Sequence, residues 1–192
     1  KVQVVPHIVS ILVFLLVTIA YFQPVFFDNE SLSQHDITQW RGGAKELVDY
    51  REATGEEALW TNRMFSGMPG YLISTRWGIG LVGFVQSVIT FGLPHPVKVV
   101  FATFIGFYIL LLSFRVRPYL ALAGALAFGL SSFNIIGLSA GHNARITAIA
   151  YMPMVLSGVH LAFTRSRLFA FSLTALALAL HLHANHLQIT YY

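Results

Sequence analysis

Five apolar runs, each about as long as a bilayer is thick, constrain this chain more than any other feature of its sequence. A helix needs about 20 mostly apolar residues to cross the hydrocarbon core of a membrane. Of the 192 residues, 56% are hydrophobic and only 10% are charged, whereas about 25% are charged in a soluble domain. The sequence therefore predicts an all-α fold, a polytopic transmembrane helix bundle, with spans at residues 7–23, 97–114, 119–138, 146–163 and 168–186.

The charged residues predict how this bundle is oriented. All eight acidic residues lie between Asp28 and Glu57, so one solvated region separates the apolar ones. Short loops rich in Lys and Arg stay cytoplasmic, and two connections contain such pairs, Arg115 with Arg117 and Arg165 with Arg167. With Lys1 on the same side, loops 24–96 and 139–145 are extracytoplasmic. The other basic residues are scattered, which argues against a nucleic-acid partner.

Two helices are expected within the long outer loop. Apolar side chains recur at helical spacing over residues 37–53, with charged ones on the other faces, which indicates an amphipathic helix on the membrane surface. Asp36 just before it, with Gln39 three residues later, resembles a capping-box start. The apolar run 79–93 is short, and the topology leaves no crossing for it. We therefore expect an interfacial or re-entrant helix there.

Asp36 is the first candidate for catalysis, and it has two interpretations. As an N-cap it would accept backbone N–H groups and stabilise the helix by about 1 kcal/mol. As a general base at the membrane surface it would take the proton of an acceptor hydroxyl. The two roles are compatible. Asp28 is the second candidate acid, and His35 and Arg41, close to Asp36, are candidate substrate contacts.

Two further groups of polar residues are candidates for binding a substrate. Trp60, Asn62 and Arg63 either line a polar site or only dock the loop. The segment SAGHNAR contains the second group, which suits phosphate oxygens because a guanidinium with neighbouring donors binds them bidentately. Alternatively, this group caps the following helix while its arginine reaches toward lipid headgroups. Its members are His142, Asn143 and Arg145.

The histidine-rich segment HLHANH, at residues 181–186, is the last candidate. Three neighbouring imidazoles suggest zinc, but on a helix only His183 and His186 share a face, and the HExxH pattern is missing. No metal site is predicted. We interpret Asn185 and His186 instead as part of the wall of a polar pocket.

Three stretches together resemble the amino-terminal part of the YfhO-type bacterial membrane proteins. They are residues 34–74, the segment AGHNARITAIAYMPMVLSGVHLAF at 140–163 and NHLQITYY at 185–192. That family is similar to the GT-C-fold glycosyltransferases, which transfer a sugar from a polyprenyl-phosphate-linked donor at the outer face of the membrane. The resemblance implies a multi-pass protein of the bacterial cytoplasmic (inner) membrane that acts on a cell-envelope glycan or lipid.

The same resemblance implies roles for individual residues. Asp36 stands where these enzymes carry an acidic catalytic residue early in the first outer loop, and His142 and Arg145 would contact the donor phosphate. SAGHNAR has no acid, whereas several GT-C enzymes have one in that loop, so a divalent cation such as Mg²⁺ or Mn²⁺ stays open. The family's members are several times longer, so the chain is expected to be truncated at its C-terminus. Oligomeric state is left open.

Two other classes of function are compatible with the residues. A lipid or solute transporter, or flippase, would pair polar residues across its spans. Asn134 and the histidine-rich fifth span offer some of this, but no acid lies within a span. A non-catalytic membrane assembly subunit, whose outer loop binds a partner, is the third reading.

Overall fold

The computed structural model describes residues 4–28, 30–76, 80–165 and 167–192. Within these ranges the regular elements are helices apart from two paired strands of two residues each, β1 (Trp60–Thr61) and β2 (Met68–Pro69). The predicted all-α class is therefore confirmed. Lys1, used for the orientation, and Ile79, the expected start of a helix, lie outside the described residues.

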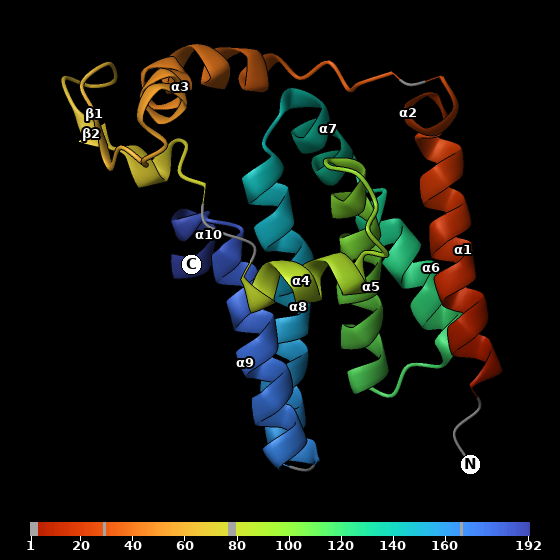
Figure 1. Ribbon diagram of the computed structural model, residues 1–192. Helices are drawn as coiled ribbons and strands as arrows, with labels where there is room; N and C mark the ends of the chain where they lie inside the picture. The colour runs from red at the N-terminus through yellow and green to blue at the C-terminus, as the bar shows by residue number, and fades with distance from the viewer. Residues whose placement is uncertain (1–3, 29, 77–79, 166) are drawn as a thin grey trace.

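Long apolar helices lie side by side and form the body of the molecule (Figure 1). α8 (Asn143–Thr164) is central and packs against both α5 (Val97–Ser113) and α9 (Arg167–His183). α1 (Val5–Tyr21) and α6 (Pro118–Gly129) pack on the other side of α5. The helices alternate in direction, so the α5–α6 and α8–α9 connections share one end, and the turn between α7 (Ser132–Ala140) and α8 lies at the other.

Aromatic stacking and close helix contacts hold this body together. The Phe14 ring stacks on Phe104, with centroids 5.3 Å apart, and Tyr108 meets Phe14 edge-on. The Nδ1 atom of His7 lies 2.9 Å from the Tyr108 hydroxyl, which joins α1 to α5. At Gly106 a Cβ atom would overlap the carbonyl oxygen of Ala150. The α5–α8 contact thus requires glycine at position 106.

Two of the expected spans differ in detail from the structure. Residues 119–138 form two helices, α6 and α7, which are bent by 41° at residues 130–131. The Asn134 side chain donates to the Phe128 carbonyl oxygen at 2.8 Å, so a side chain satisfies an acceptor at the end of α6. α9 ends at His183, three residues before the expected end, because Asn185 adopts a left-handed backbone (φ 54°) ahead of α10 (Leu187–Tyr191).

Among the described residues, one helix is long and apolar enough by itself to cross a membrane. This is α8, with 22 residues and a mean hydropathy of 1.6. The bent pair α6 and α7 would be a second if it counts as one span. α1, α5 and α9 are apolar helices of 17 residues each, at the lower limit of about 17 for a transmembrane helix.

α3 (His35–Thr54) lies across one end of the bundle (Figure 1). A helix was expected over residues 37–53, and α3 is two residues longer at its start and one at its end. The capping interpretation of Asp36 is wrong: Gln34 is the N-cap and Asp36 lies within the first turn. The Gln34 side chain does not cap the helix either, because it is hydrogen-bonded to the α7–α8 region.

The remainder of the long loop folds back onto α3. α2 (Gln23–Phe27) follows α1, while β1, β2 and a 3-10 turn (Gly70–Leu72) lie beside α3. α4 (Leu81–Ile89) runs across the long helices in the view of Figure 1 and contacts α9. α4 falls within the expected interfacial or re-entrant segment 79–93, and its Leu81 and Phe84 side chains are exposed.

Two acidic side chains fasten this loop to α3. Arg51 donates to both carboxylate oxygens of Glu57, at 2.6 and 2.8 Å, and to the Ser74 carbonyl oxygen at 2.6 Å. These hydrogen bonds hold the pKa of Glu57 below its usual value. Glu46 accepts from the Thr61 hydroxyl, which lowers the pKa of Glu46 in the same way. The ionised carboxylates therefore stabilise the folded loop.

A pair of glycine substitutions tests the α5–α8 contact. We expect Gly106→Ala to destabilise the protein by about 1 to 3 kcal/mol, because the added methyl group forces α5 away from α8. Gly42→Ala is the matched control, since nothing lies within 4 Å of a Cβ there and alanine favours a helix by about 0.5 to 1 kcal/mol. Thermal unfolding followed by circular dichroism measures both. Equal melting temperatures for the two variants would contradict the packing described.

The loop is also expected to loosen in acid before the bundle does. A carboxylate with a lowered folded-state pKa stabilises the fold above its unfolded pKa and ceases to do so as pH falls through the lowered value. For Glu57 this window lies below 4.5. Hydrogen exchange of residues 57–76, corrected for intrinsic rates, should accelerate there while that of α5 and α8 does not. Glu57→Gln should show the acceleration already at neutral pH, and Glu52→Gln should not.

Candidate functional site

The start of α3 is anchored to the turn between α7 and α8 by a pair of amides. Gln34 Nε2 donates to Asn143 Oδ1 at 2.9 Å, and Asn143 Nδ2 donates back to Gln34 Oε1 at 3.1 Å. Gln34 Nε2 also donates to the Leu138 carbonyl oxygen at 2.5 Å. Both side chains are buried. Because an unsatisfied buried amide costs about 1 to 3 kcal/mol, this pair fixes how α3 sits on the bundle.

Gly141 makes the close approach of the two segments feasible. Its φ of +106° is a left-handed conformation that ends α7, and such a backbone favours glycine. A Cβ atom there would lie 3.2 Å from both the Asp36 Cβ and the Ile37 nitrogen. The turn is therefore shaped by its own backbone to receive the first turn of α3.

Asp36 and His142 meet at this junction. The Asp36 carboxylate oxygen Oδ2 lies 2.6 Å from His142 Nε2, and 46% and 41% of the two side chains are exposed. The acid of the long loop thus contacts the imidazole of the short loop. A carboxylate and an imidazole in contact, and open to solvent, can exchange a proton with each other or with a bound hydroxyl.

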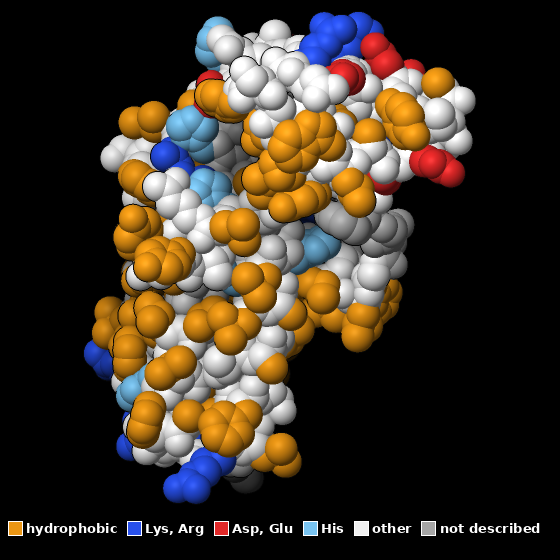
Figure 2. All heavy atoms as spheres, turned by 90° about the vertical axis from the view of Figure 1, so that its left-hand side faces the viewer, with side chains coloured by type: hydrophobic (Ala, Val, Ile, Leu, Met, Phe, Trp, Pro, Cys, Tyr) orange, Lys and Arg blue, Asp and Glu red, His pale blue; other side chains and the backbone are white. Residues whose placement is uncertain are grey.

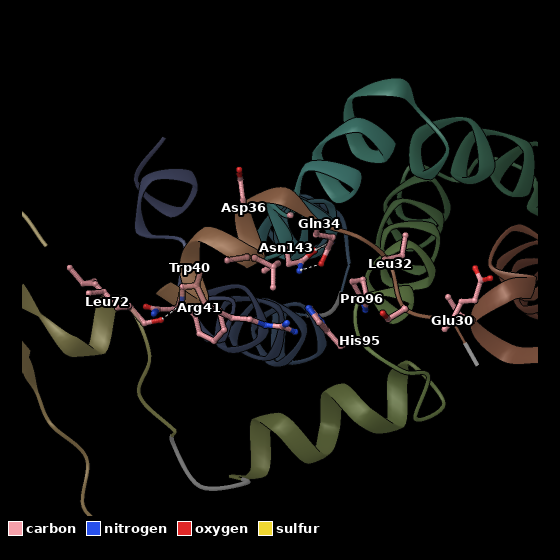
Figure 3. Close-up of a pocket in the computed structure, with 17 residues that line it drawn as sticks. Glu30, Leu32, Gln34, Asp36, Trp40, Arg41, Leu72, His95, Pro96 and Asn143 are labelled. Atoms are coloured by element: carbon pink, nitrogen blue, oxygen red, sulfur yellow. Dashed lines mark hydrogen bonds between the residues drawn. The ribbon is translucent and has the colours of Figure 1, made fainter. Parts of the chain in front are cut away.

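A cavity of about 720 Å³ lies beside this junction, within the usual range of small-molecule sites. The aromatic and apolar part of its wall includes Trp40, Leu32 and Ile73. In Figure 3 the Asp36 carboxylate points away from the row of the other labelled side chains. The polar wall includes Glu30, Gln34, Arg41, His95, Asn143 and Asn185.

Arg41 and His95 point toward one another near the middle of this row (Figure 3). Arg41 comes from α3, and His95 precedes α5, so each side chain reaches the cavity from a different element. Partial removal from water lowers the pKa of His95, and the nearby charge of Lys98 lowers it further. An anion between the two side chains would counter both effects. The pair is suited to phosphate oxygens.

Several expected site residues lie elsewhere. Trp60 Nε1 donates to Asn62 Oδ1 at 3.2 Å, and the Asn62 backbone N–H donates to Glu46. Trp60 belongs to β1, and Asn62 and Arg63 belong to the β1–β2 loop, so all three lie outside the cavity. Arg145 places its guanidinium over the Phe133 ring, 5.3 Å from the centroid. It does not line the cavity.

Of four further expected residues, one lines the cavity and three do not. Asn185 lines the cavity and donates to the Tyr71 carbonyl oxygen at 3.2 Å, whereas His186 is the N-cap of α10 and accepts from the Ile189 N–H. His35 is exposed and lies 3.1 Å from Gln39 Nε2. Asp28 ends α2. His186, His35 and Asp28 do not line the cavity.

The three histidines of HLHANH do not converge. His181 is buried, with Nδ1 2.9 Å from the Ala148 carbonyl oxygen, and so bridges α9 to α8. His183 is exposed. Over the described ranges, no three His, Cys, Asp or Glu side chains are grouped so that they could hold a metal ion.

Two residues of the site were missed at the level of sequence. Gln34 looked like an ordinary polar residue before a helix, and only its partner across the fold gives it a role. His95 lies between Pro94 and Pro96 at the start of an apolar run. A titratable side chain at the outer end of an expected span was the signal that could have identified it.

Comparison with known proteins adds no family or fold assignment, since no family model, curated protein or solved structure matches this chain.

The amide pair can be tested by removing one partner. We expect Gln34→Ala to leave Leu138 and Asn143 without their buried donor, and to raise hydrogen exchange in residues 34–41 and 141–146 by roughly tenfold or more. Gln39→Ala removes an exposed amide from the same helix and is the control. Unchanged exchange in Gln34→Ala would show that other contacts hold the junction.

Proposed function

We propose that the chain is a multi-pass protein of the bacterial cytoplasmic membrane, with α3 and the cavity on the extracytoplasmic side. The surface supports this placement. Figure 2 shows charged side chains of both signs at the upper end of one face, hydrophobic side chains over its middle and basic ones at its lower end. Large apolar side chains are exposed on the outside of the bundle, among them Leu12, Leu16, Ile136, Val159 and Phe171.

We further propose that the protein transfers a sugar from a polyprenyl-phosphate-linked donor to an extracytoplasmic acceptor. The contact between Asp36 and His142 carries this proposal. It joins an acid of the first outer loop to the second outer loop, beside a cavity lined by the Arg41 guanidinium and the His95 imidazole. The resemblance to YfhO-type proteins and GT-C enzymes supports the same reading. A base and an anion site next to each other are what such a transfer needs.

The residues divide the chemistry between them. Asp36 accepts the proton of the acceptor hydroxyl as its oxygen attacks the anomeric carbon. The bond from that carbon to the phosphate oxygen breaks, and the electron pair leaves with polyprenyl phosphate. Arg41 and His95 stabilise the negative charge of this leaving group. Direct displacement inverts the configuration at the anomeric carbon.

The geometry adds a condition on the acceptor. Because the Asp36 carboxylate faces His142 and points away from the row of Arg41 and His95, the acceptor approaches from the His142 side of α3. The donor phosphate occupies the cavity on the other side. The two substrates therefore meet at the first turn of α3.

Replacing the base tests the proposal. We expect Asp36→Asn in the full chain to lower transfer from polyprenyl-phosphate-linked sugars about 10²- to 10⁴-fold, with the melting temperature unchanged. Asp49→Asn, an exposed acid of α3 paired with Lys45, is the control. Transfer is measured with membranes and a panel of radiolabelled donors. Full activity in Asp36→Asn would exclude it as the base, and movement of unmodified donor across the membrane without transfer would favour the transporter.

A further inference from the structure

A second cavity lies at the opposite end of the bundle from Asp36. It has a volume of about 510 Å³ and is lined by the C-terminal ends of α5 and α8 and the start of α9. Five of its side chains are apolar, which suits a hydrocarbon chain. They are Ile109, Leu112, Leu161, Phe169 and Leu173.

Ser157 is the unusual side chain of this cavity. It is fully buried, and its hydroxyl oxygen has no hydrogen-bond partner among the described residues. Ser113, which also lines the cavity, donates to the Leu110 carbonyl oxygen at 2.7 Å. A buried hydroxyl without a partner costs free energy. A ligand with a polar atom at that depth would supply the partner.

The polar end of such a ligand is anionic, judging by the charges around the cavity. Arg165 follows α8 directly and lines the cavity. Arg167 follows two residues later, and the α5–α6 connection at this end contains Arg115 and Arg117. No acidic residue occurs after Glu57. The helices α5, α6, α8 and α9, whose ends meet here, therefore contain no acidic residue that could balance these arginines.

We propose that this cavity is a binding site for an anionic phospholipid of the inner leaflet. Its acyl chain lies among the apolar side chains, the Arg165 guanidinium binds its phosphate, and the Ser157 hydroxyl donates to an ester carbonyl oxygen. Ser157 lies about two helical turns before Arg165. The inference rests on the membrane placement proposed above and is independent of sugar transfer.

Lipid retention by the full chain tests this site. The purified protein is exchanged into detergent with phosphatidylglycerol or phosphatidylcholine of the same acyl chains, and bound lipid is counted by native mass spectrometry. We expect phosphatidylglycerol to be retained about tenfold more tightly, because charge-assisted hydrogen bonds to phosphate are strong. Arg165→Gln should abolish this preference. Arg167→Gln, which removes a charge outside the cavity, should keep it.

The buried hydroxyl is tested separately. Ser157→Leu should fill the cavity and lower retention of both lipids, whereas Ser157→Ala should lower it several-fold without altering the fold. Ser172→Ala, which removes an exposed hydroxyl of α9, is the control. Retention unchanged in Arg165→Gln or Ser157→Ala, or equal loss in Arg167→Gln, would overturn the proposal. So would displacement of phosphatidylglycerol by millimolar inorganic phosphate, which would indicate a site for free anions.

Discussion

The docking of α3 on the helix bundle depends on two amide side chains that satisfy each other. Gln34 and Asn143 exchange hydrogen bonds across the junction of α3 with the α7–α8 turn. Their geometry sets the position of the first turn of α3, and with it the Asp36 carboxylate and the Arg41 guanidinium. Gly141 permits the approach because it has no side chain to obstruct it. The docking of α3 is thus built on neutral hydrogen bonds, while the Asp36 carboxylate of the candidate site contacts His142.

The two ends of the bundle differ in kind. At one end α3, its loop and the α7–α8 turn enclose a cavity with polar walls and groups that can transfer protons. At the other end the helices converge on a mostly apolar cavity with one guanidinium. The core between them is packed by aromatic rings and by Gly106 against α8. This rigid middle keeps the two cavities apart, so each can be altered without the other.

How much of this was predictable follows from the range of the interactions. The all-α class and the helix over residues 37–53 depend on local periodicity, and both were found from the sequence. The bend between α6 and α7 was not, because neither Leu130 nor Ser131 is a helix breaker and the Asn134 hydrogen bond to Phe128 is specific to the fold. The partner of Asp36 was missed for the same reason. His142 was a candidate by itself, but only the tertiary docking of α3 joins the two.

The pairing of Gln34 with Asn143 also sets an order of events during synthesis. The two residues belong to distant parts of the chain, and every helix from α3 to α7 lies between them. Forming a contact between distant residues costs the entropy of closing a long loop, and the contact stabilises the fold only after the loop has closed. When the ribosome has completed α3, its anchor has not yet been translated. The bundle around α5 and α6 can assemble in the meantime, and the cavity beside α3 forms only after the α7–α8 turn emerges.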